Sequence, residues 1–379
     1  MSAERTPEPA IPGESGSSGP RRPGRGSRRR PRGKRRKALL VAAWTAAGIV
    51  AVGGTGVGYL YFKLNGNLTS VDIDQALGTD RPAKTDDGSE NILVLGSDTR
   101  AGGNDKLGGG TDDGTARSDT AMIVHVHQGH RKASVVSIPR DTLIDRPECT
   151  DTDGAEHPAA TGVMFNSAYA TGGSACAVKT VEAISGLRMD HYLEVDFSGF
   201  QKLIDELGGV RITTTEDISD PDSHLDLKAG THTLDGEQAL GLVRTRHGVG
   251  DGSDLGRIQL QQAFVKALVD QVKDIGVLGN PKKLVDLADT ATKTVTTDSG
   301  IGSVNSLMSF ASGLKGISPA GMNMVTMPVV YDPADGNRVL VEKTKAQQVW
   351  TALKNDRAIP EAATEGTATG EAKDVVNAG

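Results

Sequence analysis

The 379-residue sequence has few cysteines and lacks several familiar catalytic signatures. Its cysteines are Cys149 and Cys176, and no C-x-x-C pair occurs, so neither a thiolate metal cage nor a cysteine nucleophile is indicated. The G-x-S-x-G elbow of serine hydrolases and the P-loop of nucleotide-binding proteins are also absent. The function therefore has to be sought in other motifs.

Apolar side chains are nearly absent from residues 1–37. This segment contains 12 Lys or Arg and 3 Asp or Glu, a net charge of +9. Because the whole chain has a net charge of −6, the remainder carries −15. A segment of Pro, Gly, Ser and Arg cannot bury enough surface to offset its ordering entropy, so we predict that it is disordered. A basic tail is also compatible with nucleic-acid binding. Its position beside the segment described next favours a role in membrane topology instead, and we expect no nucleic-acid partner.

Residues 38–62 contain no charged side chain. Twenty-five such residues can cross about 30 Å of hydrocarbon as a helix, so we predict one transmembrane helix. The basic run directly before it places the N-terminus in the cytoplasm and everything after Lys63 outside the cell membrane. A cleavable signal peptide is the alternative, although its apolar core usually has only about 7–15 residues.

Both cysteines lie in the part of the chain predicted to be extracytoplasmic. An oxidising compartment and an even count favour a disulfide between Cys149 and Cys176. By closing a loop in the unfolded chain, this disulfide would stabilise the folded state by roughly 3–4 kcal/mol. Two free buried thiols are the alternative.

The body of the chain alternates between strand and helix patterns. Expected strands cover 91–95, 120–127, 133–138, 191–197, 210–213 and 322–330, and expected helices cover 166–187, 200–207, 254–272, 281–292 and 304–314. This alternation predicts an α/β domain over residues 89–354, with a central mixed β-sheet flanked by helices. We predict a polar stalk over 63–88 and a disordered tail over 355–379.

Arginine and aspartate recur where predicted strands begin or end. Asp98 and Arg100 follow a buried strand, at the end where α/β sheets usually present ligands. Arg117 and Asp119 precede another strand, and Arg140 ends a third with a planar guanidinium that suits phosphate. Each motif alone is equally compatible with an ordinary turn.

Two further motifs combine charged and amide side chains. In an extended segment, Arg244 and Arg246 would share one face and repel each other unless an anion lay between them. Asp254, Arg257 and Gln261 fall within a stripe of about 60° on a predicted helix. That stripe could line a cleft, or it could be an exposed face with an i, i+3 ion pair.

Metal-binding patterns built from neighbouring residues are weak. His125 and His127 share one face of a predicted strand and could chelate a metal, but no third ligand with suitable spacing follows. The Asp-rich segment 105–113 lacks the twelve-residue calcium-loop pattern, so we expect a flexible loop there.

Taken in order, several motifs together resemble the LytR-CpsA-Psr family. They are GSDTR, RSDT, IPRDT, NSAYATGG, VEAISGL, HYLEVDFSGFQKLIDELGGV, LDGEQAL, RTR and DLGRIQLQQ, and they span about residues 91–264. The resemblance implies an α/β/α sandwich and a phosphotransferase. Such an enzyme takes a glycopolymer from a polyprenyl-pyrophosphate carrier and joins it to peptidoglycan through a phosphodiester.

The resemblance also implies a role for most of these polar residues. Asp98 and Asp119 match the family's Mg²⁺-associated aspartates; with Arg140 they form the expected catalytic group, and Asp119 is our choice for the base. The expected pyrophosphate-binding residues are Arg100, Arg117, Arg140, Arg244, Arg246, Asp254, Arg257 and Gln261. A pyrophosphate carries two to three negative charges, which several arginines and a hard cation can hold.

The sequence departs from the family pattern at two positions. A lysine common in the family is Met164 here, and a common arginine is Leu260. The loss of two cations weakens the expected grip on the pyrophosphate and leaves open a non-catalytic regulator that binds polyprenyl phosphate. Hydrolysis of the lipid pyrophosphate at the same site, with water in place of the wall hydroxyl, is a separate alternative.

Overall fold

The computed structural model describes residues 55–56, 58–97, 118–246, 252–275, 280–368 and 376–378. The predicted basic tail and most of the predicted transmembrane segment, residues 38–54 and 57, lie outside them. Among the described residues, we find no helix with the length and apolar character needed to span a bilayer. The described part belongs almost entirely to one unit, Gly58–Gly379.

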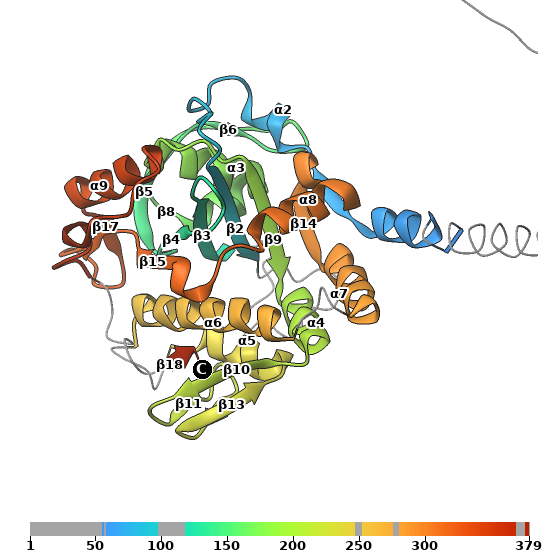
Figure 1. Cartoon of the computed structure of the whole chain (residues 1–379). Helices are drawn as coiled ribbons and strands as arrows, with labels where there is room; N and C mark the ends of the chain where they lie inside the picture. The colour runs from blue at the N-terminus through green and yellow to red at the C-terminus, as the bar shows by residue number, and fades with distance from the viewer. Residues whose placement is uncertain are drawn as a thin grey trace, which may run out of the picture. The chain divides into compact units, whose positions relative to one another are not determined.

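A seven-stranded mixed sheet forms the centre of this unit (Figure 1). In spatial order its strands are β1 (Thr69–Val71), β14 (Val295–Asp298), β9 (His191–Asp196), β2 (Glu90–Ser97), β3 (Ser118–Val126), β4 (Ala133–Ser137) and β15 (Met322–Thr326). Strand β2 runs parallel to β9 and antiparallel to β3, while β4 runs parallel to β15. The predicted mixed central sheet is therefore confirmed.

Helices cover both faces of the central sheet. On β2, Leu93 and Leu95 belong to the core that packs against α3 (Asn166–Ser185). The alternate residues Ile92 and Val94 belong to a second core, which includes residues of α8 (Val304–Leu314). Because both faces are covered, the middle of β2, residues 92–95, is continuously apolar rather than alternating in polarity.

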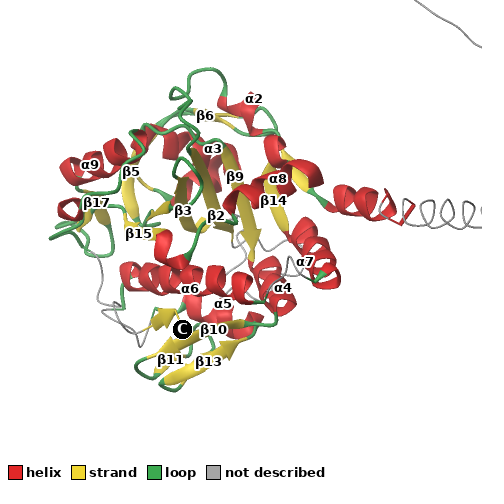
Figure 2. Ribbon diagram, viewed as in Figure 1, coloured by secondary structure: helices red, strands yellow, loops and turns green. Residues whose placement is uncertain are grey.

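A four-stranded sheet lies beside the central sheet, on the side away from α8 and β14 (Figure 2). It contains β16 (Val329–Tyr331), β17 (Val339–Val341), β5 (Thr142–Arg146) and β8 (Ala160–Met164), with α9 (Lys343–Lys354) next to it. The strand predicted over 322–330 is thus two strands in different sheets, β15 and β16, which are separated at Pro328.

The predicted disulfide between Cys149 and Cys176 is present. It joins β6 (Cys149–Thr150), which pairs with β7 (Glu156–His157), to the interior of α3.

A third hydrophobic core lies on the other side of α6 (Asp254–Asp274), which separates it from the central sheet (Figure 1). Its elements are α4 (Phe197–Leu207), α5 (Gly236–Arg244), β10 (Val210–Thr214), β11 (Ile218–Asp220), β12 (Leu225–Leu227), β13 (Gly230–Leu234) and β18 (Val376–Ala378), and α7 (Pro281–Thr294) packs on α4. Strands β13, β10 and β18 form a three-stranded sheet. Helix α6 faces the central sheet with one side and this three-stranded sheet with the other.

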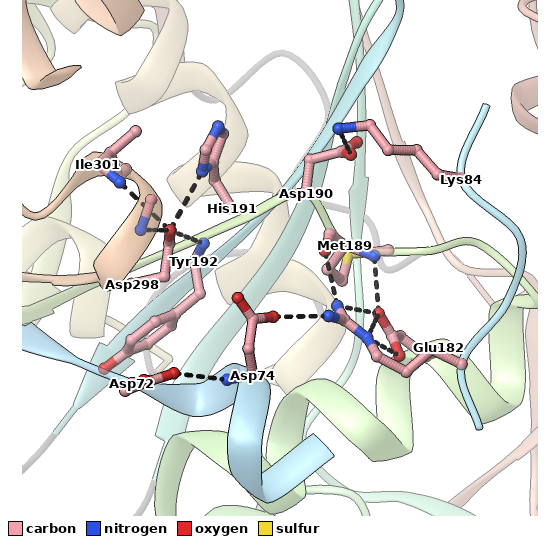
Figure 3. Close-up of polar contacts among 12 residues, drawn as sticks. Asp72, Asp74, Lys84, Glu182, Met189, Asp190, His191, Tyr192, Asp298 and Ile301 are labelled. Carbon is pink, nitrogen blue, oxygen red and sulfur yellow. Dashed lines mark hydrogen bonds and ion pairs between the residues drawn. The ribbon is translucent and has the colours of Figure 1, made fainter. Parts of the chain in front are cut away.

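The segment predicted as a stalk is part of the folded unit. Strand β1 extends the central sheet beside β14, and α2 (Ile73–Leu77) buries Ile73 and Leu77 in the main core. The Arg81 guanidinium binds Glu182 at 2.7 Å, Asp74 at 2.8 Å and the Met189 carbonyl at 2.8 Å. Figure 3 shows these partners gathered around one guanidinium. The prediction of a separate stalk was wrong because polar residues here pair with the body.

The predicted start of the disordered C-terminal tail, residue 355, was also wrong. Residues 355–368 are folded, with Ile359 and Ala363 buried in the main core and a 3-10 helix over Glu361–Ala363. The Ala, Glu and Thr composition concealed these two apolar anchors.

Candidate functional site

Strand register brings Asp119 and Arg140 together. Strands β3 and β4 are antiparallel and pair Met122 with Ser137. Asp119 lies three residues before Met122, and Arg140 lies three residues after Ser137, so both side chains lie at the same end of the strand pair. The two side chains form an ion pair there.

The N-terminus of α6 contributes two more charged side chains at this edge. Ser253 caps the helix, so Asp254 is its first residue and Arg257 lies one turn later. Asp254 forms an ion pair with Arg257, and its Oδ1 lies 3.4 Å from Arg140 Nε. Arg257 also donates to the Asp119 carbonyl at 3.2 Å. Residues separated by more than 130 positions thus form one cluster.

Within the part of the chain that the structure describes, several polar atoms of this cluster are buried without a hydrogen-bond partner. They are Arg140 Nε, Arg257 Nε and both carboxylate oxygens of Asp254, although Asp254 makes the ion pairs just described. Leaving a buried donor or acceptor unsatisfied costs about 1–3 kcal/mol, so such atoms are rare in folded proteins. Their concentration at one place is typical of a site that a ligand completes.

Burial and charge act in opposite directions on the titratable groups. Burial would lower the Arg140 pKa, but the charges of Asp119, Asp254 and Asp141 outweigh burial, so the pKa is raised. Burial lowers the pKa of Arg257 and raises the pKa of Asp141. Arg140 therefore remains cationic, while Asp141 is harder to ionise than a free carboxyl group. Both effects favour an anion at this site.

A cavity of 310 Å³ opens on the cluster. Its lining includes Arg140, Asp141, Arg246, Asp254 and Arg338. Arg338 lies directly before β17, and its Nη1 is 3.8 Å from Asp141 Oδ1. We did not predict Asp141 or Arg338 as site residues. Asp141 could have been found because it follows Arg140 in the same motif, whereas nothing in the local sequence marks Arg338.

The two arginines of the RTR motif lie in different surroundings. Arg244 is the last residue of α5, and its guanidinium lies over the Phe197 ring, 4.9 Å from the centroid. Arg246 lies beyond the helix, with its Nη2 3.9 Å from Asp254 Oδ1 and its backbone N–H bound to Asp220 at 2.8 Å. The extended geometry on which we based a shared face is absent, because Arg244 ends a helix and Arg246 lies beyond it.

The polar stripe of α6 faces inward rather than toward solvent. Arg257 and Gln261 are only 5% and 6% exposed. Gln261 donates to the Thr120 hydroxyl at 3.0 Å and to the Val243 carbonyl at 2.9 Å. Gln261 therefore connects α6 to β3 and α5 and positions the helix that carries Asp254.

Three predicted site residues, Asp98, Arg100 and Arg117, lie outside the described residues. The strands on either side of this segment, β2 and β3, are paired with each other. Ser97, directly before Asp98 in the chain, pairs with Ser118, directly before Asp119. Both predicted metal ligands thus follow residues that are paired with each other.

A group of hydroxyls around Glu194 was missed in the sequence. Tyr169 and Tyr192 donate to the two Glu194 carboxylate oxygens at 2.5 and 2.7 Å, and the Tyr169 hydroxyl lies 3.5 Å from the Ser97 hydroxyl. Burial and Glu194 raise the pKa of Tyr192, so its phenol stays protonated. Tyr169 and Glu194 lie within the NSAYATGG and HYLEVD motifs, which could have indicated them.

The two departures from the family pattern differ in their surroundings. Leu260 is buried in the third core with Phe264, where an arginine would have to bury its charge among apolar side chains. Met164 ends β8 and pairs with Leu143 of β5. An arginine at position 260 would therefore disrupt the packing of α6 in this protein.

Comparison with known proteins agrees with this architecture. The model of the LytR_cpsA_psr family matches residues 60–355. The chain belongs to the LytR-CpsA-Psr family. The resemblance predicted from the motifs is therefore confirmed, and the match begins before the stalk segment, which agrees with its folded structure.

Individual members of the LytR-CpsA-Psr family match most of the chain. The probable cell wall biosynthesis protein LcpB of Corynebacterium glutamicum is 32% identical over 334 residues, 85% of this chain and 74% of LcpB. The polyisoprenyl-teichoic acid–peptidoglycan teichoic acid transferase TagT of Bacillus subtilis is 29% identical over 343 residues, 88% of this chain and 98% of TagT. The structure of TagT bound to LI-WTA superposes with a TM-score of 0.55 at 25% identity, covering 76% of this chain and 98% of that one.

Proposed function

We propose that this LytR-CpsA-Psr protein is a phosphotransferase that moves a glycopolymer from a polyprenyl-pyrophosphate carrier to peptidoglycan through a phosphodiester. The name of TagT, a teichoic acid transferase, supports the reaction class. The observation that carries the proposal is the set of buried, unsatisfied atoms of Arg140, Arg257 and Asp254 beside a 310 Å³ cavity. A pyrophosphate would supply an acceptor for Arg140, while the Asp254 carboxylate faces the guanidiniums of Arg140 and Arg257.

The cavity provides guanidiniums at different depths. Arg140, Arg246 and Arg338 line it, with side chains that are 19%, 35% and 31% exposed, whereas Arg257 is only 5% exposed. The first three can donate directly to phosphate oxygens, and guanidinium-phosphate pairs are among the stronger hydrogen bonds in proteins. Arg257 holds Asp254 and adds positive charge behind them.

In the proposed reaction, a wall-sugar hydroxyl oxygen attacks the phosphorus that bears the glycan. The bond from this phosphorus to the bridging oxygen breaks, polyprenyl monophosphate leaves, and the hydroxyl proton passes to Asp119. In the free protein Asp119 is paired with Arg140.

We propose Mg²⁺ as the cofactor, with Asp98 and Asp119 as its ligands. The donor type fits, because carboxylate oxygens are the ligands that Mg²⁺ prefers and Asp119 has a side chain that is 26% exposed at the site. When bound, the ion would neutralise charge on phosphate oxygens. We further propose that residues 38–62 anchor the protein in the cell membrane with its N-terminus cytoplasmic and the folded unit outside. The charge-free run and the basic flank support this topology.

Transfer can be tested with the full chain purified in detergent. It is incubated with a labelled polyprenyl-pyrophosphate-linked glycan, with and without peptidoglycan, and the label is followed into the wall fraction. We expect incorporation that requires both the acceptor and Arg140. Arg211→Ala is the matched control, because Arg211 is an exposed arginine on β10.

The same assay separates the alternatives. Equal release of the glycan with and without peptidoglycan would show hydrolysis and overturn transfer. Binding of the lipid without turnover under either condition would instead support a regulator.

A further inference from the structure

His125, His127 and the distant Asp356 form a compact cluster at the opposite end of β3 from Asp119. His125 is the penultimate residue of β3, and Asp356 lies two residues beyond the end of α9. The three side chains are the only potential metal-binding group of three or more His, Cys, Asp or Glu found among the described residues, with their ligand atoms all within 4.8 Å of one another. The sequence offered two histidines without a third ligand, and the fold supplies the third.

Both histidines direct one ring nitrogen at the same carboxylate oxygen. His125 Nε2 lies 3.1 Å and His127 Nδ1 lies 2.6 Å from Asp356 Oδ1. Two ligands of a tetrahedral zinc ion at about 2.0 Å lie roughly 3.3 Å apart. The His125 distance is therefore close to that of a loaded site, whereas the His127 distance would have to open by several tenths of an ångström.

The outer ring nitrogens are held by neighbouring oxygens. His125 Nδ1 lies 2.8 Å from Asn91 Oδ1, and His127 Nε2 lies 2.8 Å from the Ser134 hydroxyl. Metal-binding histidines in proteins are usually oriented in this way by a partner on the second nitrogen. Both inner nitrogens consequently face a single point beside Asp356.

The Asn91 contact determines which nitrogen of His125 bears the proton. Asn91 Nδ2 donates to the Arg188 carbonyl at 3.0 Å, so its Oδ1 accepts from His125 Nδ1. In a neutral ring Nε2 then presents a lone pair to the Asp356 oxygen, which is repulsive unless a cation lies between them. His125 is 1% exposed, so a water molecule has little room to separate the two groups.

A second cavity gives access to the cluster. It has a volume of 450 Å³, and its lining includes His127, Ser134 and Asp356. His125 and Asp119 are six residues apart on β3, about 20 Å along an extended strand, so this place is separate from the arginine cluster. A metal held here can reach solvent through its own cavity.

We propose that His125, His127 and Asp356 bind one Zn²⁺ ion, which fastens the segment after α9 to the central sheet and leaves a fourth coordination position open to the 450 Å³ cavity. Two imidazoles and one carboxylate form a common zinc ligand set, and the two cysteines, already joined in a disulfide, do not compete. The rival is a metal-free latch in which protonated histidines bind Asp356.

The test uses the full chain in detergent, produced without a histidine tag and freed of metal. We expect ZnCl₂ titration calorimetry and elemental analysis to give one Zn²⁺ per chain, and Co²⁺ to give visible absorption bands of a low-coordinate site. Asp356→Asn should weaken Zn²⁺ by more than about 100-fold, and Asn91→Ala by about 10- to 100-fold because it only orients His125. Hydrogen exchange around residues 355–363 should slow on Zn²⁺ addition.

Asp151→Asn is the matched control. It removes a carboxylate from a His–Asp pair of similar length, His157 Nε2 to Asp151 Oδ2 at 3.0 Å, and Zn²⁺ uptake should not change. Failure of the unmodified chain to bind stoichiometric Zn²⁺, or equal binding by Asp356→Asn, would overturn the proposal in favour of the latch. If Asp356→Asn does not fold, the Co²⁺ spectrum of the unmodified chain decides.

Discussion

Two buried groups of arginine and carboxylate differ in how completely their hydrogen bonds are satisfied. Around Arg81, the guanidinium binds Glu182, Asp74 and the Met189 carbonyl, and Glu182 also accepts the Met189 N–H at 2.9 Å. Around Arg140, buried donor and acceptor atoms have no hydrogen-bond partner among the described residues. In the first group each guanidinium nitrogen of Arg81 donates a hydrogen bond, so the group stabilises the fold. The second retains bonding capacity, which a phosphorylated ligand can use.

Arg81→Ala tests the satisfied group and should have the largest effect. Arg81 and Glu182 have side chains only 5% and 3% exposed, so removing one partner leaves a buried charge unpaired, which typically costs about 3–5 kcal/mol. The measurement is urea unfolding of the full chain. Lys228→Ala breaks the exposed ion pair with Asp217 and should leave the midpoint unchanged. A midpoint for Arg81→Ala equal to that of this control would contradict the comparison.

Arg140→Ala tests the unsatisfied group and should affect activity instead. Removing a donor that stabilises developing charge lowers the rate by about 10²- to 10³-fold. Stability should change little, because Asp254 keeps Arg257 and Asp141 keeps Arg338. Transfer assays and unfolding are measured on the same preparation. Destabilisation comparable with Arg81→Ala would show that both groups are structural.

Arg338→Ala tests whether Arg338 binds the ligand together with the unsatisfied group around Arg140. We expect the KM for the lipid-linked glycan to rise about tenfold, which corresponds to roughly 1.4 kcal/mol for one charged hydrogen bond. Arg211→Ala serves again as the exposed control. An unchanged KM would restrict Arg338 to pairing with Asp141.

The His191–Asp298 pair, like the Arg81 group, has its hydrogen bonds satisfied. We expect it to make the smallest contribution to the free energy of unfolding. Asp298 accepts from the Tyr192 and Gly300 backbone and contacts His191 at 3.2 Å (Figure 3). Burial lowers the His191 pKa, but Asp298 outweighs it, so the folded pKa is raised. The resulting stability is complete below the unfolded pKa of about 6.5 and is lost as pH rises through the folded value.

Unfolding measured at about pH 6 and about pH 8.5 tests this sign, because the two values lie on either side of the unfolded histidine pKa. From the lower to the higher pH, we expect the free energy of unfolding to fall more for the unmodified chain than for His191→Gln. Equal losses would show that the pair does not contribute.

Much of the fold could be predicted because local patterns agree with it. The apolar run NILVL predicts β2, and the period of apolar residues predicts α6. Helix α5 was missed, although Asp235 and Gln238 form a capping box that the sequence displays. Strand β1 could not be found, because three residues, TSV, carry no pattern and pair only through the backbone of β14.

The site was predictable only in part, for a physical reason. Arg140 and Asp119 belong to motifs at strand ends, where sheets present ligands. Arg338 and Asp356 come from loops far along the chain, and their approach depends on the packing of β17 and α9. Neither loop has a composition that distinguishes it from an ordinary turn.

The attachment of β1 to the edge of the central sheet has a mechanical consequence. Tension applied before residue 58 would first meet the contacts that Lys63 and Asn67 make with α7 and that Asn65 makes with α8. The β1–β14 pairing and the Arg81 ion pairs come next, before β2. Strand β2 leads directly to Ser97 and the catalytic edge. With residues 38–62 as the proposed membrane anchor, these contacts would take up a pull on that segment before it reached the residues around Arg140.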